Sequence, residues 1–138
     1  MKEIFKEELL FIPKMTTKTI ILSMKPYKEA LIEFAEVYGK LKRGEKVKPK
    51  YELSFGNVEG LRDFLTGKRL DLLREIKREH PNSVYELGKI TNRDLKSINA
   101  DLKILEEHGL VKLEKTKEGR SRIVPKVNFD RIKIEINL

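Results

Sequence analysis

The sequence predicts an α+β fold in which a strand–helix–strand segment precedes a mainly helical segment that ends in strands. Two kinds of apolar spacing support this fold class. Some stretches repeat apolar residues every three or four positions, as amphipathic helices do, and others alternate them, as half-buried strands do. Helix caps and glycines separate these stretches. We place the boundary at residue 57, so that residues 1–57 form an N-terminal extension and residues 58–138 a second domain.

Three elements are predicted in the N-terminal extension. The β-branched run "KTIILSM", residues 18–24, predicts a strand. Pro26 suits the first turn of a helix that runs to about Leu41, because the apolar residues after it recur at helical spacing. The alternation in "YELSF", residues 51–55, predicts a second strand with one buried side. Residues 1–15 fit a strand or a helix.

Two helices are predicted after residue 66. The first covers residues 67–79 and ends at "HPN", since the residue before a proline avoids helical backbone. The second is short and runs to about Ile90. It begins at Ser83, which forms a capping box with Glu86.

The third predicted helix follows immediately. Thr91 or Asn92 is its expected cap, with Asp94 in the first turn, where a negative charge favours the helix dipole. The helix runs to His108, and Gly109 is expected to end it in the left-handed conformation.

The remaining residues predict strands. "LVKLEK" and "RIVPKVNF" flank a turn with Gly119 at its tip, which indicates a β-hairpin, and "RIKIEINL" alternates isoleucines with polar residues as a further strand. The order of helix, short helix, turn, helix and hairpin is typical of a winged helix-turn-helix. We therefore expect an α+β winged helix-turn-helix with an N-terminal strand–helix–strand extension.

The third helix has two contrasting faces at about 100° per residue. Its leucines and isoleucine (Leu95, Ile98, Leu102, Leu105) share one sector and are expected to pack on the other helices, with Asp101 outside the opposite sector as a partner within the protein. The candidate base-reading residues are Asn92, Arg93, Lys96, Ser97, Asn99, Ala100 and Lys103. Donors and a small side chain of this kind suit the major groove of DNA. On an isolated helix, such a strip is usually only a solvated face.

The hairpin carries a second basic cluster around Gly119. Its candidate residues for the DNA backbone or minor groove are Lys115, Lys117, Arg120, Ser121 and Arg122. A hairpin kept soluble by charge is the alternative. The reading helix and the basic hairpin together favour DNA binding more than either does alone.

The stretch "LTGKRLDLLREI…PNSVYELGKITNRDLKSINADLKILEEHGLVKLEK…GRSR" resembles winged-helix DNA-binding regulators of archaea and bacteria, in the broad MarR-like group. The match spans residues 51–130, and "LKILEEHGLV" is its most specific part. The resemblance implies sequence-specific binding of double-stranded DNA by a homodimer with the third helix in the major groove. The N-terminal extension departs from that group, because it replaces the long dimerisation helices.

Composition supports a polyanionic partner and disfavours other classes. Lys and Arg number 30 against 22 Asp and Glu, a net charge of +8. The chain has no cysteine, and His80 and His108 are expected to be helix-end residues, so we expect no metal site, no cofactor and no enzyme activity. No apolar run suggests a membrane span or a signal peptide, so we expect a cytoplasmic location. The absence of Gln, Trp and Cys leans toward a thermophile.

We therefore expect a homodimeric transcriptional regulator, with the N-terminal segment and the final strand as candidate dimer interfaces. One alternative is an antitoxin-like autorepressor whose N-terminal part binds a toxin or another protein. Another is a nonspecific architectural or RNA-binding protein. Phe34 and Tyr38 could line an effector pocket, but a core or dimer-interface face is the favoured interpretation.

Overall fold

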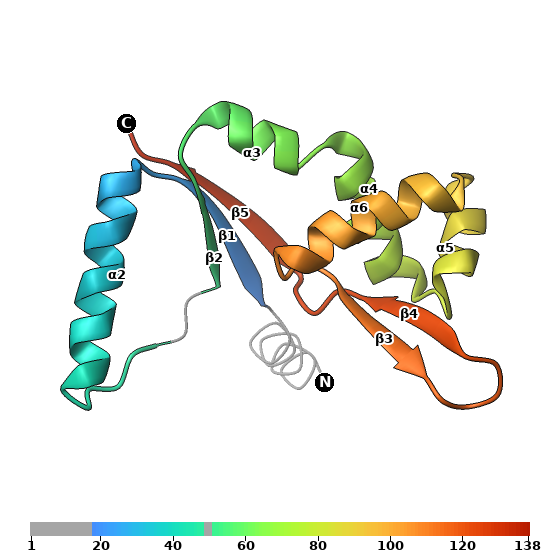
Figure 1. The fold of residues 1–138 in the computed structure, drawn as a ribbon. Coiled ribbons are helices and arrows are strands. Elements are labelled where there is room, and N and C mark those ends of the chain that lie inside the picture. The colour runs from blue at the N-terminus through green and yellow to red at the C-terminus, as the bar shows by residue number, and fades with distance from the viewer. Residues whose placement is uncertain (1–17, 49–50) are drawn as a thin grey trace, which may run out of the picture. The chain divides into compact units, whose positions relative to one another are not determined.

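The computed structural model describes residues 18–48 and 51–138 and shows a mixed α+β protein (Figure 1). The expectation for residues 1–15 lies outside the described residues. The chain divides into two compact units. Of the described residues, one unit contains those up to Leu61 together with Phe129–Leu138, and the other contains Arg62–Asn128. The predicted boundary at residue 57 lies near the first of these divisions.

The first unit is built on a three-stranded parallel sheet. Strand β1 (Thr19–Met24) lies in the middle, between β2 (Glu52–Phe55) and β5 (Arg131–Ile136). Helix α2 (Tyr27–Lys42) connects β1 to β2, as a parallel pair requires. All three strands and α2 match the predicted elements. The final strand was expected to belong with residues 58–138, but it pairs with β1 in parallel, from Thr19 opposite Arg131 to Met24 opposite Ile136.

One face of this sheet is apolar, because the registers align its hydrophobic residues. Leu22 is fully buried and lies opposite both Leu53 and Ile134. Towards β5 the face opens to solvent, where Ile134 is 50% exposed and Ile136 is 48% exposed. The apolar face is therefore best covered at its central strand.

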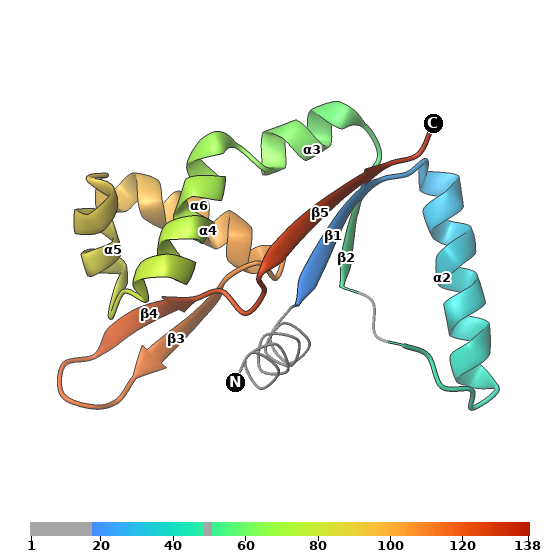
Figure 2. The same cartoon turned by 180° about the vertical axis from the view of Figure 1, so that it is seen from behind.

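Helix α2 contains no buried residue and stands off from the strands in both views (Figures 1 and 2). Lys25 links the two. Its buried Nζ lies 2.6 Å from a carboxylate oxygen of Glu33 on α2 and 2.9 Å from one of Glu52 on β2. Hydrogen bonds to Glu33 and then to Glu52 raise the pKa of Lys25 above its ordinary value. This charge cluster ties the helix to the sheet.

The second unit consists of helices followed by a hairpin. Helix α3 (Val58–Phe64), which sequence patterns did not predict, crosses the division between the units. Helices α4 (Gly67–Glu79), α5 (Val84–Thr91) and α6 (Leu95–Glu107) match the three predicted helices. Strands β3 (Lys112–Thr116) and β4 (Arg122–Lys126) pair antiparallel as the predicted hairpin. The largest fully buried side chains of this unit are Leu72, Ile76, Leu87, Ile98, Leu102, Leu105 and Leu110.

Side-chain caps set the helix boundaries in this unit. Ser83 accepts a hydrogen bond from the Glu86 amide, as the capping box predicted. The expected cap of the third helix was wrong. Asp94, not Thr91 or Asn92, is the N-cap of α6 and accepts from the Ser97 amide at 2.8 Å. Asn92 instead ends α5 in the left-handed conformation, with φ of 53°. Gly109 has φ of 78° after α6, which confirms that prediction.

Within the described residues, no helix has the length and apolar character needed to cross a lipid bilayer.

Candidate nucleic-acid interface

Helix α6 buries its apolar face from Ile98 onward. Ile98, Leu102 and Leu105 have no exposed surface, as the helical spacing predicted. The fourth predicted residue, Leu95, is 40% exposed and lies against Gly88 of α5. A side chain at Gly88 would come within 3.2 Å of Leu95, so the glycine lets α5 and the start of α6 approach closely.

The opposite face of α6 is open to solvent. Its exposed predicted site residues are Lys96, Asn99, Ala100 and Lys103, which recur at three- and four-residue steps. No acidic side chain lies among them, and Glu106 and Glu107 come only in the last turn. Ser97 is partly buried beside this strip, and Asn92 is exposed just before the helix. We call Lys96, Asn99, Ala100 and Lys103 the open strip.

Arg93 does not lie on the open strip, which corrects the sequence interpretation. It precedes the N-cap residue Asp94, so the angular reasoning for a helix does not apply to it. Its side chain is only 17% exposed. One guanidinium nitrogen donates to Ser97 Oγ and to Asp101 Oδ2, each at 2.7 Å. This nitrogen of Arg93 and the Ser97 hydroxyl are therefore engaged within the protein.

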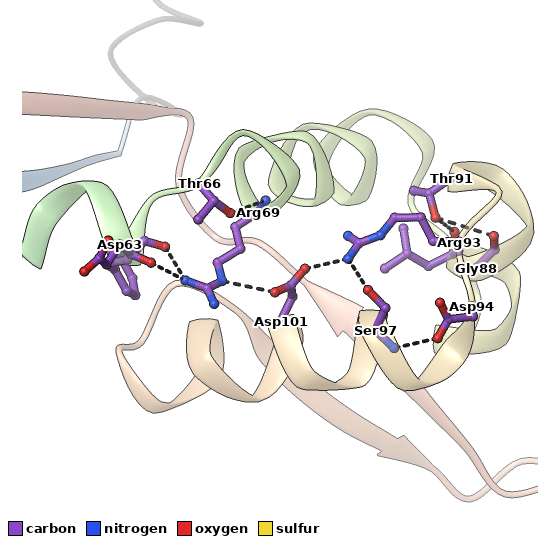
Figure 3. Close-up of polar contacts among 11 residues, drawn as sticks. Asp63, Thr66, Arg69, Gly88, Thr91, Arg93, Asp94, Ser97 and Asp101 are labelled. Atoms are coloured by element: carbon purple, nitrogen blue, oxygen red, sulfur yellow. Dashed lines mark hydrogen bonds and ion pairs between the residues drawn. The ribbon is translucent and has the colours of Figure 1, made fainter. Parts of the chain in front are cut away.

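Asp101 joins two arginines from different parts of the chain (Figure 3). Its second oxygen, Oδ1, accepts from Arg69 Nε on α4 at 3.1 Å. Arg69 also donates to the carbonyl oxygens of Asp63 and Phe64 at the end of α3. The expectation that Asp101 is a partner within the protein is confirmed. The carboxylate fixes α6 relative to α4 and to the turn before α6.

The hairpin presents its predicted basic residues to solvent. Lys115, Lys117, Arg120, Ser121 and Arg122 are all exposed, and Gly119 takes φ of 69° at the tip. Nearer the base, Lys112 and Lys126 face each other across the strands, with Glu114 3.0 Å from Lys126 and 3.4 Å from Lys112. Hydrogen bonds from Lys126 and then Lys112 lower the pKa of Glu114. The base is therefore partly neutralised, and the tip carries four exposed basic side chains beside the exposed Glu118.

A shallow pocket that sequence reasoning missed lies where α5 meets α6. It is lined by Tyr85, Gly88, Lys89, Asn92, Arg93, Asp94 and Leu95. Lys89 Nζ lies 4.8 Å from the centre of the Tyr85 ring, a cation–π contact between exposed side chains. The four-residue spacing of Tyr85 and Lys89 on a short helix was the available signal. Both add donors beside the start of α6.

The histidines lie at helix ends, as expected. His80 ends α4 in the left-handed conformation. His108 ends α6, where its Nδ1 lies 2.8 Å from the Ile104 carbonyl oxygen and its ring packs against Phe64. Over residues 18–48 and 51–138, no group of histidine and acidic side chains is arranged to hold a metal ion.

Comparison with known families shows that residues 64–134, just over half of the chain, match the family HVO_A0114. This range includes α4, α5, α6 and the hairpin. A comparison with curated proteins finds no match.

Proposed function

The chain belongs to the HVO_A0114 family, and we propose that it is a sequence-specific, double-stranded DNA-binding transcriptional regulator. In this proposal, residues 62–128 act as a winged helix-turn-helix of MarR-like type, and the protein works as a homodimer. One observation carries the proposal. Helix α6 combines an apolar face that is buried at Ile98, Leu102 and Leu105 with an acid-free open strip, and a basic hairpin follows it in the same unit.

The open strip suits the major groove, which admits one α-helix. Lys96 and Lys103 can donate to base acceptors or phosphates, and the Asn99 amide can both donate and accept at a base edge. Ala100, between them, keeps the strip low enough for close approach and offers a methyl group to a thymine. Sequence preference would therefore come mainly from Lys96 and Asn99.

The hairpin suits the phosphate backbone or the adjacent minor groove. Arg120 and Arg122 are exposed near its tip with Lys115 and Lys117. Exposed cations at a turn are free to follow phosphates, which gives affinity without reading sequence. We therefore assign the hairpin to positioning.

Arg93 and Asp101 receive a supporting role in this proposal. Their 2.7 Å ion pair and the Asp101–Arg69 contact hold α6 against α4. A reading helix must be held rigidly, because small displacements break hydrogen bonds to base edges. Arg93 would act on DNA binding through the position of α6.

An antitoxin-like autorepressor is a second candidate, favoured by the exposed face of α2. Five large apolar residues at alternating four- and three-residue steps are 48–77% exposed: Tyr27, Leu31, Phe34, Tyr38 and Leu41. This spacing is that of a coiled-coil seam, so another helix fits the face. In this version, the DNA-binding unit represses its own operon while α2 binds a partner protein.

Selection of bound duplexes from a random DNA pool tests the proposed function. We expect an enriched pseudo-palindromic site whose half-sites lie about 34 Å apart, or a multiple of that distance. Enrichment with the Asn99→Ala variant should lose preference at one position in each half-site. Absence of any enriched sequence, with affinity that collapses at modest salt for DNA and RNA alike, would show a nonspecific nucleic-acid-binding protein instead.

A further inference from the structure

We propose that the open edge of β5 is the dimer interface, where it pairs antiparallel with β5 of a second copy about a twofold axis at Ile134. The two three-stranded sheets would then join into one sheet across the dimer. The inference deepens the homodimer in the proposed function and does not depend on DNA binding.

Among the described residues, the outer side of β5 is an open sheet edge. In the sheet order β2-β1-β5, no strand from residues 18–48 or 51–138 lies beyond β5. The strand has six residues and contains neither proline nor glycine. Proteins usually shorten, bend or cover such edges, because unpaired N–H and C=O groups invite another strand. An uninterrupted edge of this kind is suited to receiving one.

The backbone of β5 permits an axis at Ile134. Arg131 donates its N–H to Lys18 O, so this residue directs its N–H toward β1. Because direction alternates along a strand, Ile132, Ile134 and Ile136 direct their N–H and C=O groups to the open edge. An axis at Ile134 pairs Ile134 with its own copy and Ile132 with Ile136 of the partner subunit. Both strands would then present outward-directed groups to each other.

The charges on β5 are complementary in this register. The axis places Lys133 opposite Glu135 of the partner subunit and Glu135 opposite Lys133 of the partner subunit. In one chain, the two side chains lie on the same face 3.2 Å apart and are 61% and 40% exposed. A shift of the axis by one residue would instead set Lys133 against its own copy, or Glu135 against its own copy. Like charges directly opposite destabilise a strand pair, so the charges on β5 favour the axis at Ile134 over either neighbouring axis.

The same pairing extends the apolar face of the sheet. Ile134 and Ile136 are about half exposed in one chain, at the side of the face that lies next to the open edge. In the dimer, they would meet the isoleucines of the partner subunit on the same face. The pairing thus combines backbone hydrogen bonds, apolar contact and charge in one register.

Charge reversal at Lys133 and Glu135 tests this register. The test measures dimerisation without DNA by sedimentation equilibrium, and folding by circular dichroism. Lys133→Glu alone and Glu135→Lys alone should each weaken the dimer roughly tenfold, because each sets two like-charge pairs opposite each other. An equimolar mixture of the two variants should form heterodimers of wild-type strength, and the double variant should dimerise normally. Loss of the contact within one chain cannot explain recovery on mixing.

Cysteine cross-linking tests the axis directly. The chain has no cysteine, so Ile134→Cys introduces a single thiol. Directly opposed residues of a hydrogen-bonded antiparallel pair lie about 5.5 Å apart at Cα, within reach of a disulfide. Ile134→Cys should form a covalent dimer on mild oxidation, and Arg131→Cys, which would lie opposite residue 137 of the second copy, should not.

Three outcomes would overturn the inference. They are a monomeric wild-type protein at its highest soluble concentration, reversal variants that dimerise like the wild type, and failure of Ile134→Cys to cross-link. If the protein still dimerises in either of the last two cases, the dimer forms through another surface, and the proposed homodimer stands without the β5 interface. A cross-linked dimer that selects no DNA sequence removes the proposed function and leaves the β5 interface intact.

Discussion

Arg93, the residue before the N-cap of α6, is held 2.7 Å from Asp101 in the middle of the same helix. Because Asp101 also binds Arg69 on α4, one carboxylate links α6 both to α4 and to the residue before its N-cap. Its side chain is 16% exposed, and both arginines are similarly covered. The first basic residue of the motif "NRDLKS" is therefore engaged in contacts within the protein.

Asp101→Ala should destabilise the second unit by about 2–3 kcal/mol, because it leaves two partly buried guanidinium groups without their carboxylate. Urea unfolding followed by circular dichroism measures the change. Asp71→Ala is the matched control. It removes a 72% exposed aspartate 3.7 Å from Arg74, and should change stability by less than about 0.5 kcal/mol. Equal losses of stability in the two variants would show that Asp101 does not stabilise the unit through its contacts with the two arginines.

Arg93→Ala and Lys96→Ala should act differently on DNA binding. Lys96→Ala should keep the stability of the fold and lose about 1–3 kcal/mol of binding to the preferred site, with relaxed preference at one base position. Arg93→Ala should lower stability and weaken all sites alike. Binding to the selected site and to single-base variants of it, beside unfolding curves, separates the two. If Arg93→Ala instead lost preference at one base position, Arg93 would contact a base directly.

Arg120→Ala should weaken binding to all sequences and reduce the slope of log affinity against log salt by about 1, because one phosphate contact is lost. Fluorescence anisotropy over a salt series measures the slope. Arg74→Ala removes an exposed arginine from α4 and should leave the slope unchanged. An unchanged slope in Arg120→Ala would place the hairpin away from the backbone.

Lys25 predicts a loss of stability at high pH. Because its folded pKa is raised above the ordinary 10.5, its contribution is complete below that pH and declines as pH rises toward the folded pKa. Lys25→Met should cost about 3 kcal/mol at pH 7, since it leaves the nearly buried Glu52 carboxylate without its cation. The difference between wild type and variant, measured by urea unfolding, should stay constant to pH 10 and shrink above pH 10.5. A difference that grows with pH would contradict the charge cluster.

Phe34→Ser should leave the stability of the fold within about 0.5 kcal/mol of wild type, because the ring is 68% exposed. Leu102→Ala, at a fully buried position, should cost about 2–5 kcal/mol. Unfolding in urea compares them. A large loss in Phe34→Ser at low protein concentration would mean that the ring packs within the chain.

Local elements were largely predictable because their signals are local. The spacing of Leu70, Leu73 and Ile76, with the proline after His80, located α4, and Ser83 and Gly109 marked helix ends. Helix α3 was missed because its seven residues are too few for the helical period to repeat recognisably.

Pairings between distant residues were not predictable in the same way. Alternation in "RIKIEINL" indicates that one side of a strand is buried, but not which strand pairs with it, so the partnership of β5 with β1 came only from the structure. The candidate site residues also differ in how well the sequence predicted their positions. Lys96, Asn99 and Lys103 follow from helical angle, whereas Arg93 stands outside the helix, where that angle has no meaning.

The partnership of β1 with β5 also has a consequence for the order of folding. Lys18 and Asp130, which hydrogen-bond at the start of this pairing, lie 112 residues apart in sequence. Between them, Arg62–Asn128 form a unit from continuous chain. Contacts between neighbouring segments form early, and closing a long loop is slow. During synthesis, we therefore expect α4, α5, α6 and the hairpin to fold before β5 can pair with β1. Until then β1 lacks one neighbouring strand, and the incomplete sheet is the folding intermediate most prone to aggregation.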